Sequence, residues 1–313
     1  MDLPGNYAFR APTQDDVDAV GDVLLADQQT DGVEPTLDAS FVRQAWSRPD
    51  LDLAADAWVV SDPARSIVAY GQVTREGPGV ASSWGVVHPA HRRRGIGSWL
   101  FDRIEARAAE LLEGAPAPRF RHAINSADDA AAAMAGARGL RPIRRFWHMQ
   151  IDLAGPIEPV PAPDGIEIGG IEPADDLRAV HAIIDGAFAD DAGDHPEPFE
   201  VWLEEHASSP SYDPTLWLLA TVRGEPVGAL TANIWGDRGW VNEIGVLPPH
   251  RGRGIGSALL RRSFATFARR EHQSVFLNVD AENPTGATAL YERVGMRTVN
   301  RWELWERSSV VSS

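Results

Sequence analysis

The chain has 313 residues, of which 29 are Lys or Arg and 45 are Asp or Glu, giving a formal net charge of −16. Every one of the 29 is arginine, and the absence of cysteine excludes disulfides, thiolate metal sites and a cysteine nucleophile. The acidity argues against a nucleic-acid binder, which would present basic patches to phosphate. No apolar run approaches the ~20 residues of a membrane span, and no secretory signal is recognisable. We therefore expect a cytoplasmic protein with no membrane partner and, at this length, two domains.

A long repeat indicates how the chain is divided. Residues 84–100 read WGVVHPAHRRRGIGSWL and residues 243–259 read EIGVLPPHRGRGIGSAL, with 10 of 17 positions identical. The offset of 159 residues is too long for a solenoid, so it indicates a duplicated domain. The segment PIEPVPAPDG between the copies suits a stiff, extended linker. We predict an N-terminal domain over residues 1–155, a proline-rich linker over 156–164 and a C-terminal domain over 165–313.

Each copy is predicted to begin with a short strand and one or two helices, followed by three strands, a helix, a strand, a helix and a last strand. In the second copy the early strands are expected at 166–171, 216–222, 227–234 and 240–247. A helix is expected at 254–270, with Leu259, Leu260, Phe264 and Phe267 on one face. A strand at 274–279, a helix at 285–294 and a strand at 298–305 complete the copy. This order predicts an α/β (α+β) fold with a mixed sheet in each domain.

A glycine-rich turn precedes the amphipathic helix of each copy. The turn comprises Arg251, Gly252, Arg253, Gly254, Ile255, Gly256 and Ser257 in the second copy, and Arg92, Arg93, Arg94, Gly95, Ile96, Gly97 and Ser98 in the first. Glycines let the backbone approach a ligand, and the first amides of a helix attract an anion, so a diphosphate is the expected ligand. The turn lacks the G-K-[ST] ending of nucleotide-hydrolase loops and the third glycine of the dinucleotide fingerprint. On its own it could also be only a tight connection.

A second motif follows the turn in the C-terminal copy. It comprises Asn283, Ala287, the pair Leu290-Tyr291 and the pair Gly295-Met296. Together with Arg251, Gly254 and Gly256, this motif resembles the GNAT superfamily of acetyl-CoA-dependent N-acetyltransferases. The resemblance covers most of residues 165–305 and, at motif level, residues 87–97. It implies two tandem GNAT-type domains, each a splayed, mixed sheet flanked by helices, whose fourth and fifth strands part to admit the pantetheine of acetyl-CoA.

The resemblance also implies roles in direct acetyl transfer to a primary amine within a ternary complex. The backbone N–H of Val246 would face the thioester carbonyl, Tyr291 would protonate the leaving thiolate, and Asn283 would lie among the CoA-binding residues. Glu243 would take the proton of the acceptor amine. Relatives also place this carboxylate at the position of Trp240 or use the position of Asn278, and water alone could take the proton. Packing on the sheet remains the alternative for the tyrosine, and an ion pair with an arginine the alternative for the glutamate.

The first copy departs from the motif at both chemical positions. Trp84 stands where the second copy has Glu243, and Ala135 stands where it has Tyr291. Its glycine-rich turn is intact, and Val87 corresponds to Val246. We therefore expect a catalytically degenerate domain that still binds acetyl-CoA, with a purely structural role as the alternative.

The distribution of charge along the chain predicts the charge of the acceptor. Residues 156–250 carry a net charge of −15, whereas residues 251–313 carry +4. The family builds its acceptor cleft in the acidic part, so we expect a cationic small-molecule or peptide amine, steered by that field. Solvated acidic helices that only aid solubility are the alternative. Histidine spacing gives no reason to expect a metal.

Several functional readings stay open. A layout of two copies, with the catalytic residues in the second, is similar to that of mycothiol synthases. Amino sugars, polyamines, antibiotics and protein N-termini also remain possible acceptors. A non-catalytic protein that binds acetyl-CoA and reports its level to a partner is the alternative from another class. The sequence leaves the oligomeric state undetermined.

Overall fold

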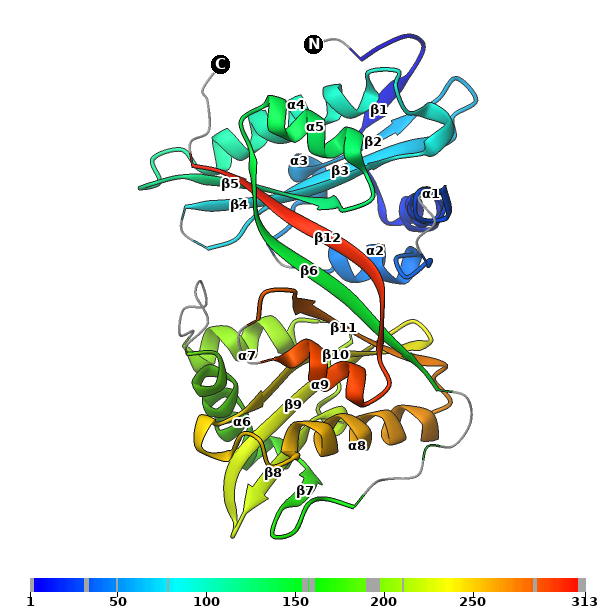
Figure 1. The fold of residues 1–313 in the computed structure, drawn as a ribbon. Helices are drawn as coiled ribbons and strands as arrows, with labels where there is room; N and C mark the ends of the chain where they lie inside the picture. Colours follow the sequence, from blue (N-terminus) through cyan, green and yellow to red (C-terminus); the bar gives the residue numbers. More distant parts are fainter. Residues whose placement is uncertain are drawn as a thin grey trace. The chain divides into compact units, whose positions relative to one another are not determined.

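A computed structural model of the chain describes residues 3–30, 34–48, 50–77, 79–153, 157, 161–189, 198–209, 211–283 and 286–308. The chain forms two compact units, one made of Met1–Trp147 with Val299–Ser313 and the other of His148–Thr298. Each unit has a mixed sheet with helices packed against it, as the sequence predicts (Figure 1).

The sheet of the first unit has the order β1-β2-β3-β4-β5-β12, and β4 and β5 are its parallel pair. Its strands are β1 (Ala8–Arg10), β2 (Ala57–Ser61), β3 (Ile67–Arg75), β4 (Val80–Val87), β5 (Arg119–Asn125) and, from the end of the chain, β12 (Arg297–Arg307). Its helices are α1 (Val17–Thr30), α2 (Ala39–Trp46), α3 (Leu53–Asp56), α4 (Ile96–Leu111) and α5 (Asp129–Ala137), with the 3-10 turns η1 (Gln14–Asp16) and η2 (Pro89–His91).

The sheet of the second unit has the order β6-β11-β10-β9-β8-β7. Its strands are β6 (Arg141–Asp152), β7 (Glu167–Gly170), β8 (Leu218–Val222), β9 (Glu225–Trp235), β10 (Arg238–Val246) and β11 (Ser274–Asp280). Its helices are α6 (Pro173–Phe188), α7 (Phe199–Ala207), α8 (Ile255–Arg269) and α9 (Ala287–Arg293), with the 3-10 turns η3 (Pro214–Leu216) and η4 (Pro248–His250).

Helices α6 and α8 cover opposite faces of the second sheet. A Cβ on Gly239 would lie 2.7 Å from the ring of Phe267 on α8, whereas a Cβ on Gly245 would lie 2.8 Å from the Cβ of Ala187 on α6. The bulge between Val241 and Glu243 in β10 reverses the alternation of side chains, which explains why these two odd-numbered glycines face different helices.

The two copies have exchanged their last strands. β12 pairs antiparallel with β5, from Trp302 opposite Asn125 to Arg307 opposite Phe120. β6 in turn lies beside β11, where the N–H of Leu153 donates to the carbonyl oxygen of Gln273 at 2.8 Å. The compact units therefore differ from the domains predicted at 1–155 and 165–313, because 299–313 belong to the first unit and 148–153 to the second. Residues 156 and 158–160 of the predicted linker at 156–164 lie outside the described residues.

In both units the parallel pair of strands separates partway along its length. β10 and β11 are paired at Gly239–Val275 and Trp240–Phe276, after which β10 runs on to Val246 with no further pairing to β11 among the described residues. β4 and β5 are paired from Val80 as far as Ser83, opposite His122. The splayed sheet that the resemblance implies is confirmed.

Candidate active site

The glycine-rich turn of the second unit leads directly into α8. Gly252 and Gly254 have φ angles of +75° and +81°, a left-handed conformation that favours glycine. Gly254 is the N-cap of α8, so the first amides of the helix, which have no partner within it, lie at the turn. The turn thus has the backbone geometry and the helix dipole of an anion site.

Arg251 ties this turn to its surroundings. Its Nε donates to the carbonyl oxygen of Val246 at 3.1 Å, and its Nη2 donates to that of Ala187 at 2.8 Å. The N–H of Leu247 donates to the carbonyl oxygen of Val227 on the β9 side. Because successive residues of an antiparallel ladder point their amides to opposite sides, the N–H of Val246 points away from β9, toward the side where β11 has parted.

The turn of the first unit has the same backbone. Gly95, the N-cap of α4, has φ and ψ of 85° and −4°, close to the 81° and 2° of Gly254. Arg93 adopts a φ of +59° where the second unit has Gly252. A left-handed arginine costs about 1–2 kcal/mol, so the first unit maintains the turn without the glycine that would favour it.

The arginines of the first turn have different partners. Arg92 forms an ion pair with Asp27 on α1. Arg94 donates to the hydroxyl of Tyr7 at 3.1 Å and to the carbonyl oxygen of Ala90 at 3.1 Å. A carboxylate therefore lies beside the first turn, at a place where the second turn meets a backbone carbonyl.

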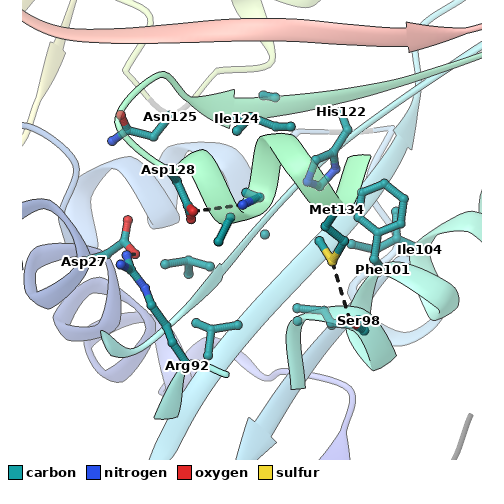
Figure 2. Close-up of a pocket in the computed structure, with 18 of the residues that line it drawn as sticks. Asp27, Arg92, Ser98, Phe101, Ile104, His122, Ile124, Asn125, Asp128 and Met134 are labelled. Carbon is teal, nitrogen blue, oxygen red and sulfur yellow. Dashed lines mark hydrogen bonds and ion pairs between the residues drawn. The ribbon is translucent and has the colours of Figure 1, made fainter. Parts of the chain in front are cut away.

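A cavity of about 530 Å³ opens at this turn, between the separated ends of β4 and β5 (Figure 2). Asp27 and Arg92 lie at one side of it, and Ser98, Met134 and His122 at the other. The remaining lining comes from Gly85, Val86, Val87, Arg93, Gly95, Gly97, Leu100, Phe101, Ile104, Ala123, Ile124, Asn125, Asp128, Ala130 and Ala131. The cavity thus lies where the resemblance places pantetheine.

The two chemical positions of the first unit are occupied by packing residues. Trp84 contacts the rings of Phe41 and Tyr70, with centroids 5.5 and 5.0 Å apart. Ala135 is fully buried in the core. Neither position can donate or accept a proton.

In the second unit the Leu290-Tyr291 pair lies close to the end of β10. A Cβ on Gly256 would lie 3.1 Å from Cδ2 of Leu290 and 4.0 Å from Cγ2 of Val246, so the first turn of α8 can approach both because residue 256 is glycine. Tyr291 is buried, and its burial raises the pKa of the phenol. The phenol is therefore held in the protonated form that a proton donor needs.

Glu243 lies on β10 directly after the bulge at Asn242, facing Thr231 of β9. The Oγ1 of Thr231 donates to Glu243 Oε2 at 2.9 Å, and the Nε1 of Trp202 donates to Oε1 at 3.3 Å. His206 Nε2 lies 3.3 Å from Oε2. Among the described residues, Glu243 thus contacts these three side chains and not the arginine that the sequence left open as its partner. No sequence motif points to Trp202, His206 or Thr231.

The other positions considered for the base are engaged differently. Trp240 stacks on Trp235, with ring centroids 4.0 Å apart. Asn278 Oδ1 is 2.9 Å from Nδ1 of His148, whose ring also packs on Trp240. Both residues are therefore engaged in contacts with neighbouring aromatic side chains.

The remaining predicted binding residues surround the two turns. Ile255 and Ile96 face the core, each 1% exposed, so they contribute their backbone only. Gly97 and Ser257 lie in the first turns of α4 and α8. Arg253 Nη1 is 3.2 Å from Nδ1 of His250. Asn283 lies in the turn after β11, where its N–H donates to the carbonyl oxygen of Asp280 at 3.2 Å.

Within the described ranges, no group of three or more His, Cys, Asp or Glu side chains is arranged to hold a metal ion. Across the same residues, no helix has the length and apolar character needed to cross a bilayer.

Comparisons with known proteins agree on one family. The model of the Acetyltransferase (GNAT) family matches residues 178–296. A Catenulispora acidiphila protein named mycothiol acetyltransferase is 30% identical over 309 residues, covering 91% of this chain and 93% of the relative. A crystal structure of a GCN5-related N-acetyltransferase from Sphaerobacter thermophilus is 34% identical with a TM-score of 0.86, covering 100% of this chain and 98% of its own. A tandem GNAT protein from the clavulanic acid biosynthesis pathway, 18% identical with a TM-score of 0.69, covers 98% of this chain and 99% of its own and shows the same fold.

Proposed function

Because the chain belongs to the GNAT acetyltransferase family, we propose that its second unit is the catalytic one and transfers acetyl from acetyl-CoA to a primary amine by direct attack. The observation that carries this proposal is the meeting of Val246, Gly256 and Leu290, which brings the Leu290-Tyr291 pair to the splayed end of β10. The first unit has the same glycine-rich turn and the same separation of its parallel strands. It has Trp84 in place of Glu243 and Ala135 in place of Tyr291.

The second turn fits acetyl-CoA on its geometry. Left-handed glycines at 252 and 254 leave no side chain over the first amides of α8, which would bind the diphosphate. Residue 256 tolerates no bulk, since even a Cβ would press on Leu290. Bound acetyl-CoA supplies the thioester carbonyl that the amine attacks.

Two side chains of the second unit would then transfer protons, and one backbone N–H would stabilise the developing charge. Glu243 takes the proton of the ammonium acceptor, directly or through water. The N–H of Val246 stabilises the negative charge that develops on the carbonyl oxygen. Tyr291 gives its proton to the sulfur as the C–S bond breaks, so that the leaving group departs as a thiol. An acyl-cysteine intermediate is excluded because the chain has no cysteine, which favours direct attack.

For the first unit we propose acetyl-CoA binding without catalysis. Its turn keeps the backbone of the second turn, and its cavity of about 530 Å³ lies between the parted strands, where a pantetheine arm fits. Two bound acetyl-CoA molecules per chain would support this role, and one would leave the unit purely structural.

The acceptor that we propose is a cationic amine in the cytoplasm. The surplus of acids in residues 156–250, net −15, would attract it. The name of the relatives, mycothiol acetyltransferase, makes the desacetylated form of mycothiol the first candidate acceptor.

The test is the release of CoA thiol with a panel of amines. The panel contains desacetyl-mycothiol, an amino sugar, a polyamine, an aminoglycoside and a peptide with a free N-terminus, with the N-acetylated form of each as its control. We expect one cationic amine to stimulate release, with a KM that rises with salt because added ions screen the field. Binding of acetyl-CoA with no stimulation by any amine would instead support the non-catalytic sensor.

A further inference from the structure

The carboxylate of Glu243 on β10 lies against the imidazole of His206 on α7. Glu243 Oε2 is 3.3 Å from Nε2 of His206, whose side chain is 14% exposed. The rings of Trp202 and Trp217 pack on the imidazole, with centroids 4.5 and 5.4 Å away. The contact is therefore shielded from solvent on the side of the two indoles.

The other nitrogen of the histidine fixes where its proton lies. His206 Nδ1 is 2.8 Å from the carbonyl oxygen of Trp202. A carbonyl oxygen can only accept, so Nδ1 carries a hydrogen. In the neutral ring, Nε2 would then present a lone pair to a carboxylate oxygen of Glu243, which is repulsive. The contact is attractive only if one further proton lies between Nε2 and Oε2.

From this geometry we infer that His206 and Glu243 share one proton, and that the pair, rather than the glutamate alone, is the base that deprotonates the acceptor amine. The inference rests on the proposed function of the second unit. His206 acts through Glu243 and is a positioning residue.

The remaining partners of Glu243 are neutral donors that do not titrate. Its carboxylate accepts hydrogen bonds from Thr231 Oγ1 and Trp202 Nε1. When the pair loses its shared proton, the lone pair of Nε2 faces the carboxylate without a proton between them. That arrangement makes the pair a stronger base than the carboxylate with its two neutral donors.

The charged groups around His206 raise its pKa, which favours the protonated imidazole that the geometry requires. Burial alone would lower the pKa of His206, but the hydrogen bond and charge of Glu243 outweigh it, with a smaller contribution from Glu205, so the pKa lies above 6.5. Of the neighbouring titratable groups, His181 on α6 contacts the ring of Trp202, and Tyr212 before β8 contacts the ring of Trp217. Glu200, Glu204 and Glu205 lie on α7 with the histidine, and Asp175, Asp176, Arg178 and Asp185 lie on α6.

The transfer balances in protons. One ammonium proton passes to the pair, and the free amine forms the C–N bond while the C–S bond breaks. The sulfur leaves with the phenol proton of Tyr291, and the tyrosine recovers a proton from the acetylated nitrogen. The pair then releases its proton to solvent, so that one proton is produced per turnover.

The first experiment measures the shared proton without turnover. Histidine-labelled protein is titrated by NMR as wild type and as Glu243→Gln, with His206→Gln to assign the signal. We expect the midpoint of His206 to lie above 6.5 in the wild type and to fall by at least one pH unit in Glu243→Gln, where burial acts unopposed. The same midpoint in both proteins would overturn the inference.

The second experiment measures kcat/KM against pH with one acceptor. In the wild type, we expect kcat/KM to fall on the acid side of the profile (the acid limb) with a midpoint equal to that of His206 in the NMR titration. In His206→Gln the limb should move to lower pH by at least one unit, and kcat should fall about tenfold, while the KM for acetyl-CoA stays unchanged. An unmoved limb in His206→Gln would overturn the role of the pair as base.

Two control variants separate titration from packing. Thr231→Val removes a neutral donor from the same carboxylate but no titrating group, so its acid limb should move to higher pH, the direction opposite to that of His206→Gln. His272→Gln alters a histidine whose Nδ1 also contacts a carbonyl oxygen, that of Asp237 at 3.0 Å, and whose ring packs on Phe267. Among the described residues, His272 has no carboxylate partner. If His272→Gln moves the limb as His206→Gln does, the inference is wrong. If no amine is acetylated by the wild type, the proposed function fails, whereas the NMR titration still decides whether the proton is shared.

Discussion

Arg92 is ion-paired with Asp27 beside the glycine-rich turn of the first unit, and both residues line the cavity of that unit. Its counterpart in the second unit, Arg251, bonds the carbonyl oxygens of Val246 and Ala187 instead. The two turns share a backbone conformation, but the first has both an additional arginine, Arg93, where the second has Gly252, and the carboxylate of Asp27. The Asp27 carboxylate offsets the additional arginine and should therefore weaken the binding of acetyl-CoA at the first site.

Replacing Asp27 with asparagine should tighten the binding of CoA to the first unit by about three- to tenfold, because it removes a like charge from beside the diphosphate. Calorimetry with two classes of site measures the change, and the affinity of the second unit should stay constant. Asp22→Asn, an exposed acid on the same helix, is the matched control and should have little effect. Weaker binding in Asp27→Asn would show that the ion pair positions Arg92 for the ligand.

Replacing Tyr291 with phenylalanine should lower kcat about 100-fold or more, the usual size of a general-acid contribution being about 10²- to 10⁴-fold. The KM for acetyl-CoA should change little, because the ring that packs on the sheet is kept. Steady-state thiol release with the best amine of the panel checks this. Tyr212→Phe, in the same unit but packed on Trp217, serves as the control. Equal rates in wild type and Tyr291→Phe would assign the tyrosine to packing.

The turns and the motif helix could be predicted from the sequence because they are local. Gly95 and Gly254 specify a left-handed cap directly before an amphipathic helix, and the structure has α4 and α8 starting one residue later. Tyr291 was placed by its motif at a helix position that the structure confirms, although its role stays a prediction.

Two features depend on contacts between distant segments, and the sequence could not specify them. The last strands of the two copies, GLRPIRRFWHM and GMRTVNRWELW, have similar patterns, so either could pair with β5 or with β11, and only the folded chain distinguishes the two arrangements. His206 belongs to an acidic stretch without a motif. Its significance comes from its contact with Glu243, which lies on a different element.

Replacing Gly239 with alanine should destabilise the second unit by about 1–3 kcal/mol, the usual cost of overpacking. The new Cβ would lie 2.7 Å from the ring of Phe267, a large side chain that is fully buried and has little room to move. Urea denaturation followed by tryptophan fluorescence measures the loss. Gly169→Ala on the edge strand β7, where a Cβ would meet nothing within 4 Å, is the control and should be close to neutral. Equal stability of the two variants would contradict the packing described for α8.

The first unit should lose stability as the pH falls from 6.5 toward 4. Burial lowers the pKa of His122 from 6.5 to about 4, so in this range the unfolded chain binds a proton that the folded chain excludes. Stability therefore rises with pH across the window, and one such histidine accounts for about 3 kcal/mol between its two ends. His122→Asn places at this position the residue type that the second copy has at Asn278, and removes the titrating group. Its free energy of unfolding, measured with urea from pH 7 to 4, should have a pH slope smaller than that of the wild type by close to one proton. An unchanged slope would show that His122 takes up its proton in the folded state as readily as in the unfolded one.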